Sequence, residues 1–240
     1  MEAEEVKQIY NQAVANKENY EANRWFKNKI QAAGFVMTRR QILKYCGPIE
    51  FSTCLEIGPG QGTWTSVLME NHSESSLDLV DISREMLDLC QNRFKNHKNI
   101  RYFANDFLKF IPDKKYDFVF SARALEYIPD KDLAIKKIAK ILNPSGVGFI
   151  ITKTPKYWRK KFLGIEVPEL HQGQITPKKL KTLMERHGLV DLEFYPVTTS
   201  FPVINFAKTN MFLFTLFKES KLNFFNQLFC ESYGVKFKKI

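Results

Sequence analysis

The segment from Glu56 to Gly62 constrains this chain more than any other, because it carries three glycines in seven residues. It follows the apolar stretch Cys54–Leu55 and precedes Thr63–Leu68, which has the pattern of a helix. Glycines allow a sharp turn and a close approach of the backbone to a ligand, since they have no Cβ. The following helix would present its free N–H groups at the same place. The segment therefore predicts a ligand-binding turn between a strand and a helix.

The spacing of the glycines separates two classes of ligand. Dinucleotide-binding turns have the spacing G-x-G-x-x-G, whereas this chain has G-x-G-x-G, with Thr63 in place of the third dinucleotide glycine. Glu56 also lies two residues before the first glycine. Its carboxylate would repel a pyrophosphate but suits a ligand with an ammonium or sulfonium charge. The spacing thus disfavours a dinucleotide.

Further strands, each followed by polar residues, come next in the chain. The predicted strands cover residues 76–81, 100–104, 116–121 and, with a preceding turn, 142–151. Asp81 ends the first of these, about 20 residues beyond the glycine turn, where a carboxylate can accept from ribose hydroxyls. Ser83 is a suitable N-cap for the helix that follows. The pattern predicts a nucleoside-containing ligand.

This order of motifs resembles that of the class I S-adenosylmethionine-dependent methyltransferases. In that family an acid after the third strand accepts from the adenine amino group and its neighbour covers the ring, roles that match Asp106 and Phe107. The resemblance implies S-adenosylmethionine (SAM) as cofactor and S-adenosylhomocysteine as product. The candidate cofactor-binding residues are Glu56, Gly58, Pro59, Gly60, Gly62, Asp81, Ile82, Asn105, Asp106, Phe107 and Ser121.

Alternating strands and helices predict an α/β fold with a mostly parallel sheet. The resemblance makes this a Rossmann-like, seven-stranded sheet with helices on both faces and an antiparallel last strand at 232–238. We expect one domain over residues 1–240: a helical lid (1–48), a SAM-binding core (49–153), and a substrate cap with the C-terminal strands (154–240). Within the lid, Gly34 is expected to interrupt the helical pattern and Gly47–Pro48 to end it.

Three residues are candidates for catalysis. Related enzymes often carry Glu-His where this chain has Glu126–Tyr127, and Arg123 could position groups nearby. Histidine titrates near neutral pH, whereas tyrosine has a pKa of about 10. His171 is therefore favoured as the base that would deprotonate an acceptor hydroxyl, ahead of Tyr127 and Glu126. That His171 is only a surface or hydrogen-bonding residue stays an open alternative.

The acceptor is less constrained than the donor. A net charge of +10 suits nucleic acid, anionic lipid or an anionic small substrate, but also simple solubility. Basic and aromatic residues alternate over 156–162, and phenylalanines crowd 201–229, which favours a lipid-like substrate or peripheral membrane contact unless these rings merely pack. We expect methyl transfer to a small or lipid-like acceptor at oxygen. RNA methylation and a non-catalytic SAM-binding interaction module remain alternatives.

Other features bear on metals and location. The four cysteines are scattered without a C-x-x-C pair, so we expect buried thiols and no metal site. The acidic N-terminus lacks the apolar core of a secretory signal, and no stretch reaches the ~18 apolar residues of a spanning helix. The sequence thus favours a cytoplasmic location, with or without membrane association.

Overall fold

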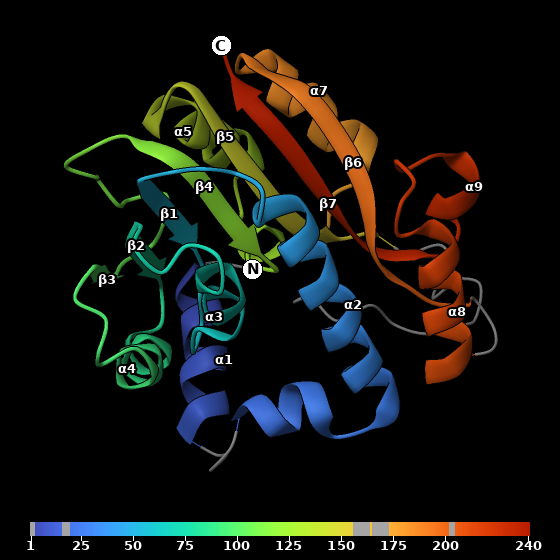
Figure 1. The fold of residues 1–240 in the computed structure, drawn as a ribbon. Helices are drawn as coiled ribbons and strands as arrows, with labels where there is room; N and C mark the ends of the chain where they lie inside the picture. Colours follow the sequence, from blue (N-terminus) through green and yellow to red (C-terminus); the bar gives the residue numbers. More distant parts are fainter. Residues whose placement is uncertain (1–2, 16–19, 156–163, 165–172, 202–204) are drawn as a thin grey trace.

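The computed structural model describes residues 3–15, 20–155, 164, 173–201 and 205–240. Seven strands form one sheet in the order β3-β2-β1-β4-β5-β7-β6 (Figure 1). Their bounds are β1 Thr53–Ile57, β2 Ser76–Asp81, β3 Ile100–Ala104, β4 Tyr116–Ala122, β5 Leu142–Lys153, β6 Leu189–Thr199 and β7 Cys230–Lys239. Strands β1 to β5 pair in parallel, and β7 is antiparallel to both β5 and β6. The predicted fold class, including its antiparallel last strand, is confirmed.

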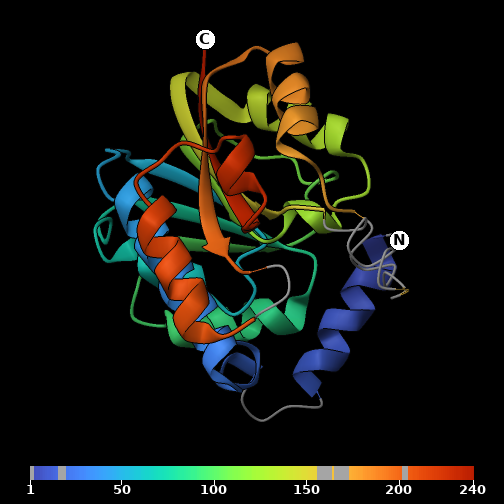
Figure 2. The same cartoon turned by 90° about the vertical axis from the view of Figure 1, so that its right-hand side faces the viewer.

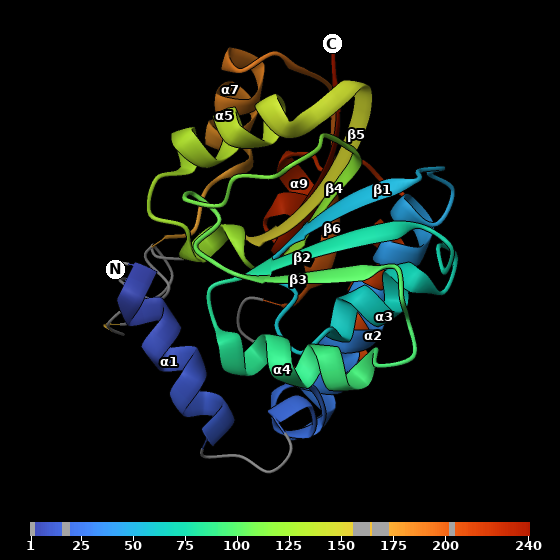
Figure 3. The same cartoon turned by 90° about the vertical axis from the view of Figure 1, so that its left-hand side faces the viewer.

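Helices cover both faces of the sheet. Their bounds are α1 Ala3–Ala15, η1 Ala22–Phe26, α2 Lys29–Cys46, α3 Thr63–Met69, α4 Arg84–Arg93, η2 Leu125–Tyr127, α5 Lys131–Ile141, α7 Pro177–Arg186, α8 Ala207–Phe217 and α9 Phe224–Gln227. Helices α2, α3 and α4 pack on one face, and α5 and α7 on the other (Figure 3). Because both faces are covered, the central parallel strands are buried nearly throughout. None of the helices in the described part of the chain is long and apolar enough to cross a membrane.

Local sequence signals set most helix ends. The Ser83 hydroxyl accepts from the backbone N–H of Met86 at 3.1 Å and so caps α4, as predicted. The predicted end of α2 at Gly47 is also confirmed. The predicted interruption at Gly34 is wrong, because α2 runs through it. A glycine costs a helix only about 1 kcal/mol, and α2 is held by packing of Ala33 against α8.

The phenylalanine-rich segment divides into packed and exposed rings. Helix α8 lies beside α2, with Phe214 fully buried between them (Figure 2). Phe201, Phe217, Phe225 and Phe229 contact one another through their rings. By contrast, Phe206, Phe212 and Phe224 are mostly exposed, and Phe225 is 63% exposed despite its ring contacts. The two interpretations of this segment, internal packing and an apolar surface, therefore each describe some of its phenylalanines.

Candidate functional site

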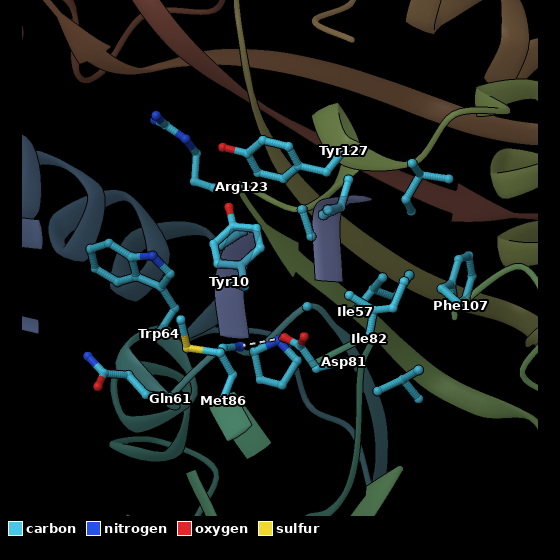
Figure 4. Close-up of a pocket in the computed structure, with 18 of the residues that line it drawn as sticks. Tyr10, Ile57, Gln61, Trp64, Asp81, Ile82, Met86, Phe107, Arg123 and Tyr127 are labelled. Carbon is cyan, nitrogen blue, oxygen red and sulfur yellow. Dashed lines mark hydrogen bonds between the residues drawn. The ribbon is translucent and has the colours of Figure 1, made fainter. Parts of the chain in front are cut away.

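A pocket opens at the edge of the sheet where the parallel strands have their carboxyl ends (Figure 4). Its volume is about 1080 Å³, open mouth included. Four connections line it, those that follow β1, β2, β3 and β4, together with α1 and η1 from the N-terminal region. Ligands of open α/β sheets bind in such crevices because successive strand-to-helix turns converge there.

The glycine turn after β1 has the backbone that its sequence predicts. Gly58, Gly60 and Gly62 all have positive φ angles, of 70°, 57° and 82°. A Cβ on Gly58 would lie 2.3 Å from the Cβ of Ala124, so this glycine permits close packing of two turns. A Cβ on Gly60 would meet no atom within 4 Å, although Gly60 lines the pocket. Gly60 thus leaves open space on the pocket side of the turn.

Asp81 ties the second strand to this turn. Its Oδ2 accepts from the backbone N–H of Gly60 at 2.9 Å, and its Oδ1 accepts from the N–H of Ser83 at 3.0 Å (Figure 4). Burial raises the pKa of Asp81 from its ordinary value, and the backbone N–H groups partly offset this. The result is a carboxylate fixed in direction and facing the pocket.

The connection after β3 forms the next part of the wall. Asn105, Asp106 and Phe107 all line the pocket, as does Ile82. Oδ1 of Asp106 accepts from the N–H of Leu108 at 2.9 Å, which orients the carboxylate. The Phe107 ring is 5% exposed. These residues give one end of the pocket acceptors and an apolar wall, the combination that a purine base requires.

Four predicted site residues are not among the described residues that line the pocket: Glu56, Gly62, Ser121 and Glu126. The Ser121 hydroxyl donates to the carbonyl of Ile57 at 3.0 Å between β4 and β1. Glu56 is buried, and this raises its pKa to about 8, while the Thr65 hydroxyl lowers it and Asp81 raises it. Gly62 caps α3 and would clash with Phe94 if it had a Cβ. Glu56, Gly62 and Ser121 thus pack beneath the glycine turn and do not face the pocket.

The other end of the pocket is built from aromatic and basic side chains. Tyr10 of α1 and Tyr127 of η2 meet edge to face, with ring centroids 5.7 Å apart (Figure 4). Burial raises the pKa of both tyrosines above the ordinary value of a tyrosine. Both hydroxyls therefore stay protonated at neutral pH. Trp25 lies 5.0 Å from the Trp64 ring and also lines the pocket, so it serves both packing and the site.

The lining includes residues that no sequence pattern singled out. Arg24, Trp64 and Met86 carry no motif, and they reach the pocket from η1, α3 and α4. Their helical periodicity is the same as that of ordinary core residues, so only the fold distinguishes them. Arg93 on α4 pairs with Glu21, which holds the segment before η1 against the core.

The candidate catalytic residues lie in different places. Tyr127 lines the pocket, whereas Glu126 is 2% exposed and sits behind it. Oε2 of Glu126 accepts from the Thr152 hydroxyl at 2.9 Å, and its Oε1 lies 3.3 Å from Nε of Arg123. His171 falls outside the residues that the structure describes, as does the basic and aromatic segment 156–162.

Comparisons with known proteins agree with this geometry. Residues 54–146 match the family model of a methyltransferase domain. The chain is 29% identical over 98 residues to a malonyl-[acyl-carrier protein] O-methyltransferase of Ilyobacter polytropus, covering 41% of this chain and 38% of that protein. It is 22% identical over 172 residues to a demethylmenaquinone methyltransferase of Bacillus licheniformis, covering 61% of this chain and 74% of that one.

A solved structure shows the same fold over nearly the whole length. It is the N-methyltransferase NodS from Bradyrhizobium japonicum in complex with S-adenosylhomocysteine, with 17% identity, a TM-score of 0.64 and 97% coverage of both chains. The family match thus identifies a methyltransferase domain in residues 54–146, and the order of strands around the glycine turn is that of the class I S-adenosylmethionine-dependent methyltransferase fold.

Proposed function

We propose that this protein transfers a methyl group from SAM to a small or lipid-like acceptor, at oxygen. The observation that carries the proposal is the continuity of one pocket. The donor-type residues Gly60, Asp81 and Asp106 line one end of it, and Tyr10 and Tyr127 line the other. A donor and an acceptor in one pocket could be held in line for transfer, which is a large part of catalysis.

The residues present fit SAM. Gly60 leaves open space at the turn, so the backbone could approach the cofactor closely. Asp81 would accept from the ribose hydroxyls, and Asp106 from the adenine amino group, with Phe107 against the ring. When bound, SAM supplies a methyl group on a sulfonium that leaves as a neutral thioether. A wall of fixed acceptors suits such a cationic donor.

The side chains at the acceptor end would position the oxygen that receives the methyl group. The high pKa of Tyr127, caused by burial and by the neighbouring Glu126, keeps its hydroxyl protonated at neutral pH. Tyr127 therefore acts as a hydrogen-bond donor in this proposal. Glu126, which does not line the pocket, would orient the Arg123 side chain. His171 stays the proposed base for an acceptor hydroxyl.

Calorimetry with S-adenosylhomocysteine tests the donor half. We expect binding that is weakened by Asp81→Ala; no binding to the wild-type chain would refute the proposal. Release of S-adenosylhomocysteine from SAM in the presence of small hydroxyl-bearing and amine-bearing acceptors then tests the reaction. Binding without turnover on such a panel would favour a SAM-binding interaction module, and turnover on RNA would favour the nucleic-acid alternative.

The atom that is methylated is part of the proposal. The Ilyobacter relative is named an O-methyltransferase, and NodS is named an N-methyltransferase. The chain spans less than half of the length of the malonyl-[acyl-carrier protein] O-methyltransferases that it matches. Oxygen is favoured here because Tyr10 and Tyr127 offer hydroxyls to an acceptor, and neither is a carboxylate that would hold an ammonium group.

We also propose that the chain works as one domain with a lid over 1–48 and a cap over 154–240, and that the cap contacts anionic membranes. Phe224 is 86% exposed and Phe225 63% exposed, and the lysines of this segment give it a positive charge. Cosedimentation with phosphatidylcholine vesicles, with and without phosphatidylserine, tests this contact. Phe224→Ser with Phe225→Ser should abolish binding, and Ile111→Ser, which changes another exposed apolar side chain, should not.

A further inference from the structure

Positive charge gathers at the acceptor end of the pocket. Arg123 follows β4 and has a φ of 70°, an uncommon conformation for a residue other than glycine. Its backbone N–H donates to the carbonyl of Ile151 at 2.8 Å, which holds it there, and the residue lines the pocket. Backbone strain of this kind tends to persist where it positions a functional group. Arg123 is thus presented to the pocket at some cost to the fold.

Among the described residues, Arg123 has one carboxylate neighbour, Glu126, and that neighbour is buried. Glu126 is 2% exposed and is held by Thr152. Its Oε1 lies 3.3 Å from Nε of Arg123, but the alignment does not make a hydrogen bond, and this Nε is buried without a hydrogen-bond partner among the described residues. A buried donor of this kind costs stability unless a partner satisfies it.

Two more cations lie close by. Arg24 of η1 lines the pocket, with its guanidinium 4.8 Å from the centre of the Trp25 ring. Lys153 ends β5. Within the described residues, neither Arg24 nor Lys153 forms an ion pair. Arg123 is therefore accompanied by two further cations, neither of which forms an ion pair with another described residue.

The electrostatics of Lys153 support this description. Burial, together with the nearby Arg123 and Arg24, lowers the pKa of Lys153 to about 8, against the opposing effects of Glu126 and Glu231. Three cations thus face two carboxylates, and one of these, Glu231, also accepts from the Ser200 hydroxyl at 2.5 Å. An anion that entered this region would relieve the repulsion.

We infer that the methyl acceptor carries an oxyanion, a carboxylate or a phosphate, that binds Arg123 and Arg24 at the outer end of the pocket. This inference rests on the proposed function and specifies its substrate class. Guanidinium groups match the geometry of both oxyanions through paired N–H donors. The Tyr10 and Tyr127 hydroxyls, which line the same end, can donate to the same group.

The oxyanion serves as a handle and is not the atom that is methylated. An oxygen that is paired with a guanidinium has its electron density drawn toward the cation, which weakens it as a nucleophile. In Figure 4 the Arg123 guanidinium also points away from Asp81, the residue that marks the donor end. Glu126 is a positioning residue that orients Arg123.

Binding of small probes tests the inference. Protein saturated with S-adenosylhomocysteine is titrated with propanoate, propyl phosphate and the neutral isostere propanamide, with line broadening and shifts followed by NMR. We expect one of the two anions to bind at least about tenfold more tightly than propanamide, the effect of one hydrogen bond to a charged group. Which anion binds identifies the handle as carboxylate or phosphate.

Variants connect this binding to the named residues. Arg24→Gln removes a cation without disturbing Glu126 and should weaken the favoured anion about tenfold, with unchanged affinity for S-adenosylhomocysteine. The double variant Arg123→Gln with Glu126→Gln removes the pair without leaving a buried charge and should do the same. Arg39→Gln changes an arginine that pairs with Glu70 on the surface, and should leave anion binding unchanged.

Two results would overturn the inference: propanamide binding as tightly as both anions, or anion binding that Arg24→Gln leaves intact. Either result could occur while S-adenosylhomocysteine still binds, in which case the proposed function stands and only the substrate class is wrong. If the wild-type chain binds no S-adenosylhomocysteine, the proposed function itself fails.

Discussion

The backbone N–H of Gly60 donates a 2.9 Å hydrogen bond to Oδ2 of Asp81, and so joins the turn after β1 to the end of β2. The two residues are neighbours because β1 and β2 pair in parallel, which brings their carboxyl ends to the same edge. The bond aims the carboxylate into the pocket. It also means that the glycine turn and the acid form one unit.

Removing the charge of Asp81 should weaken cofactor binding. Asp81→Asn keeps the shape of the side chain but makes it a poorer acceptor for hydroxyl groups. We expect S-adenosylhomocysteine to bind at least about tenfold more weakly by calorimetry, since hydrogen bonds to charged groups contribute about 1.5–3 kcal/mol. Asp88→Asn, an exposed change on α4, is the control and should leave the affinity as it is. Equal affinities for the two variants would contradict the role of Asp81.

Substitutions at two glycines with similar backbone conformations distinguish the effect of backbone strain from that of ligand contact. Gly60 and Gly188 have φ angles of 57° and 74°, and neither would place a Cβ within 4 Å of another atom. Gly60→Ala and Gly188→Ala should each lower the free energy of unfolding by about 1–3 kcal/mol through backbone strain. Only Gly60→Ala should also lower the affinity for S-adenosylhomocysteine, because only Gly60 lines the pocket. A loss of affinity in both variants would point to strain alone.

Glu56 should make the fold less stable as the pH rises. Its pKa is raised to about 8 by burial, whereas a glutamate in the unfolded chain ionises near ~4.3. Between these values the folded state binds more protons than the unfolded state, so the free energy of unfolding falls as pH rises through this window. Glu56→Gln should flatten that fall in melting curves recorded from pH 5 to pH 8. The exposed Glu50→Gln is the control, and a slope that Glu56→Gln leaves unchanged would argue against the burial of a neutral carboxyl.

Tyr127→Phe tests whether this hydroxyl is a donor or a base. Because burial and Glu126 raise the pKa of Tyr127, we expect kcat to fall by less than the roughly hundredfold minimum for loss of a general base. If kcat rises with pH, the pH at which it reaches half of its maximum should be the same in the variant as in the wild type. The affinity for S-adenosylhomocysteine should also stay the same. A midpoint that disappears in the variant would identify Tyr127 as the base.

The sequence by itself predicted most of the strand-end residues that line the proposed donor half of this pocket. Gly58, Gly60, Asp81, Asp106 and Phe107 all lie at or within three residues of the carboxyl end of a strand, and in a parallel sheet these ends share one edge. Their positions therefore needed no knowledge of packing. Ser121, near the end of β4, was selected by the same reasoning, but its hydroxyl donates to the Ile57 carbonyl and it is not among the described residues that line the pocket.

The sequence marked Tyr127 and Arg123 as candidates, but only the tertiary structure decided which residues meet at the acceptor half. Tyr10, Arg24, Arg123 and Tyr127 come from α1, η1 and the connection after β4, and they meet because the N-terminal helices fold over the sheet edge. An aromatic or basic residue on an amphipathic helix has the same local pattern whether it faces a core, solvent or a pocket. The donor site is thus encoded by neighbours along the chain, whereas the acceptor site depends on long-range packing that periodicity cannot specify.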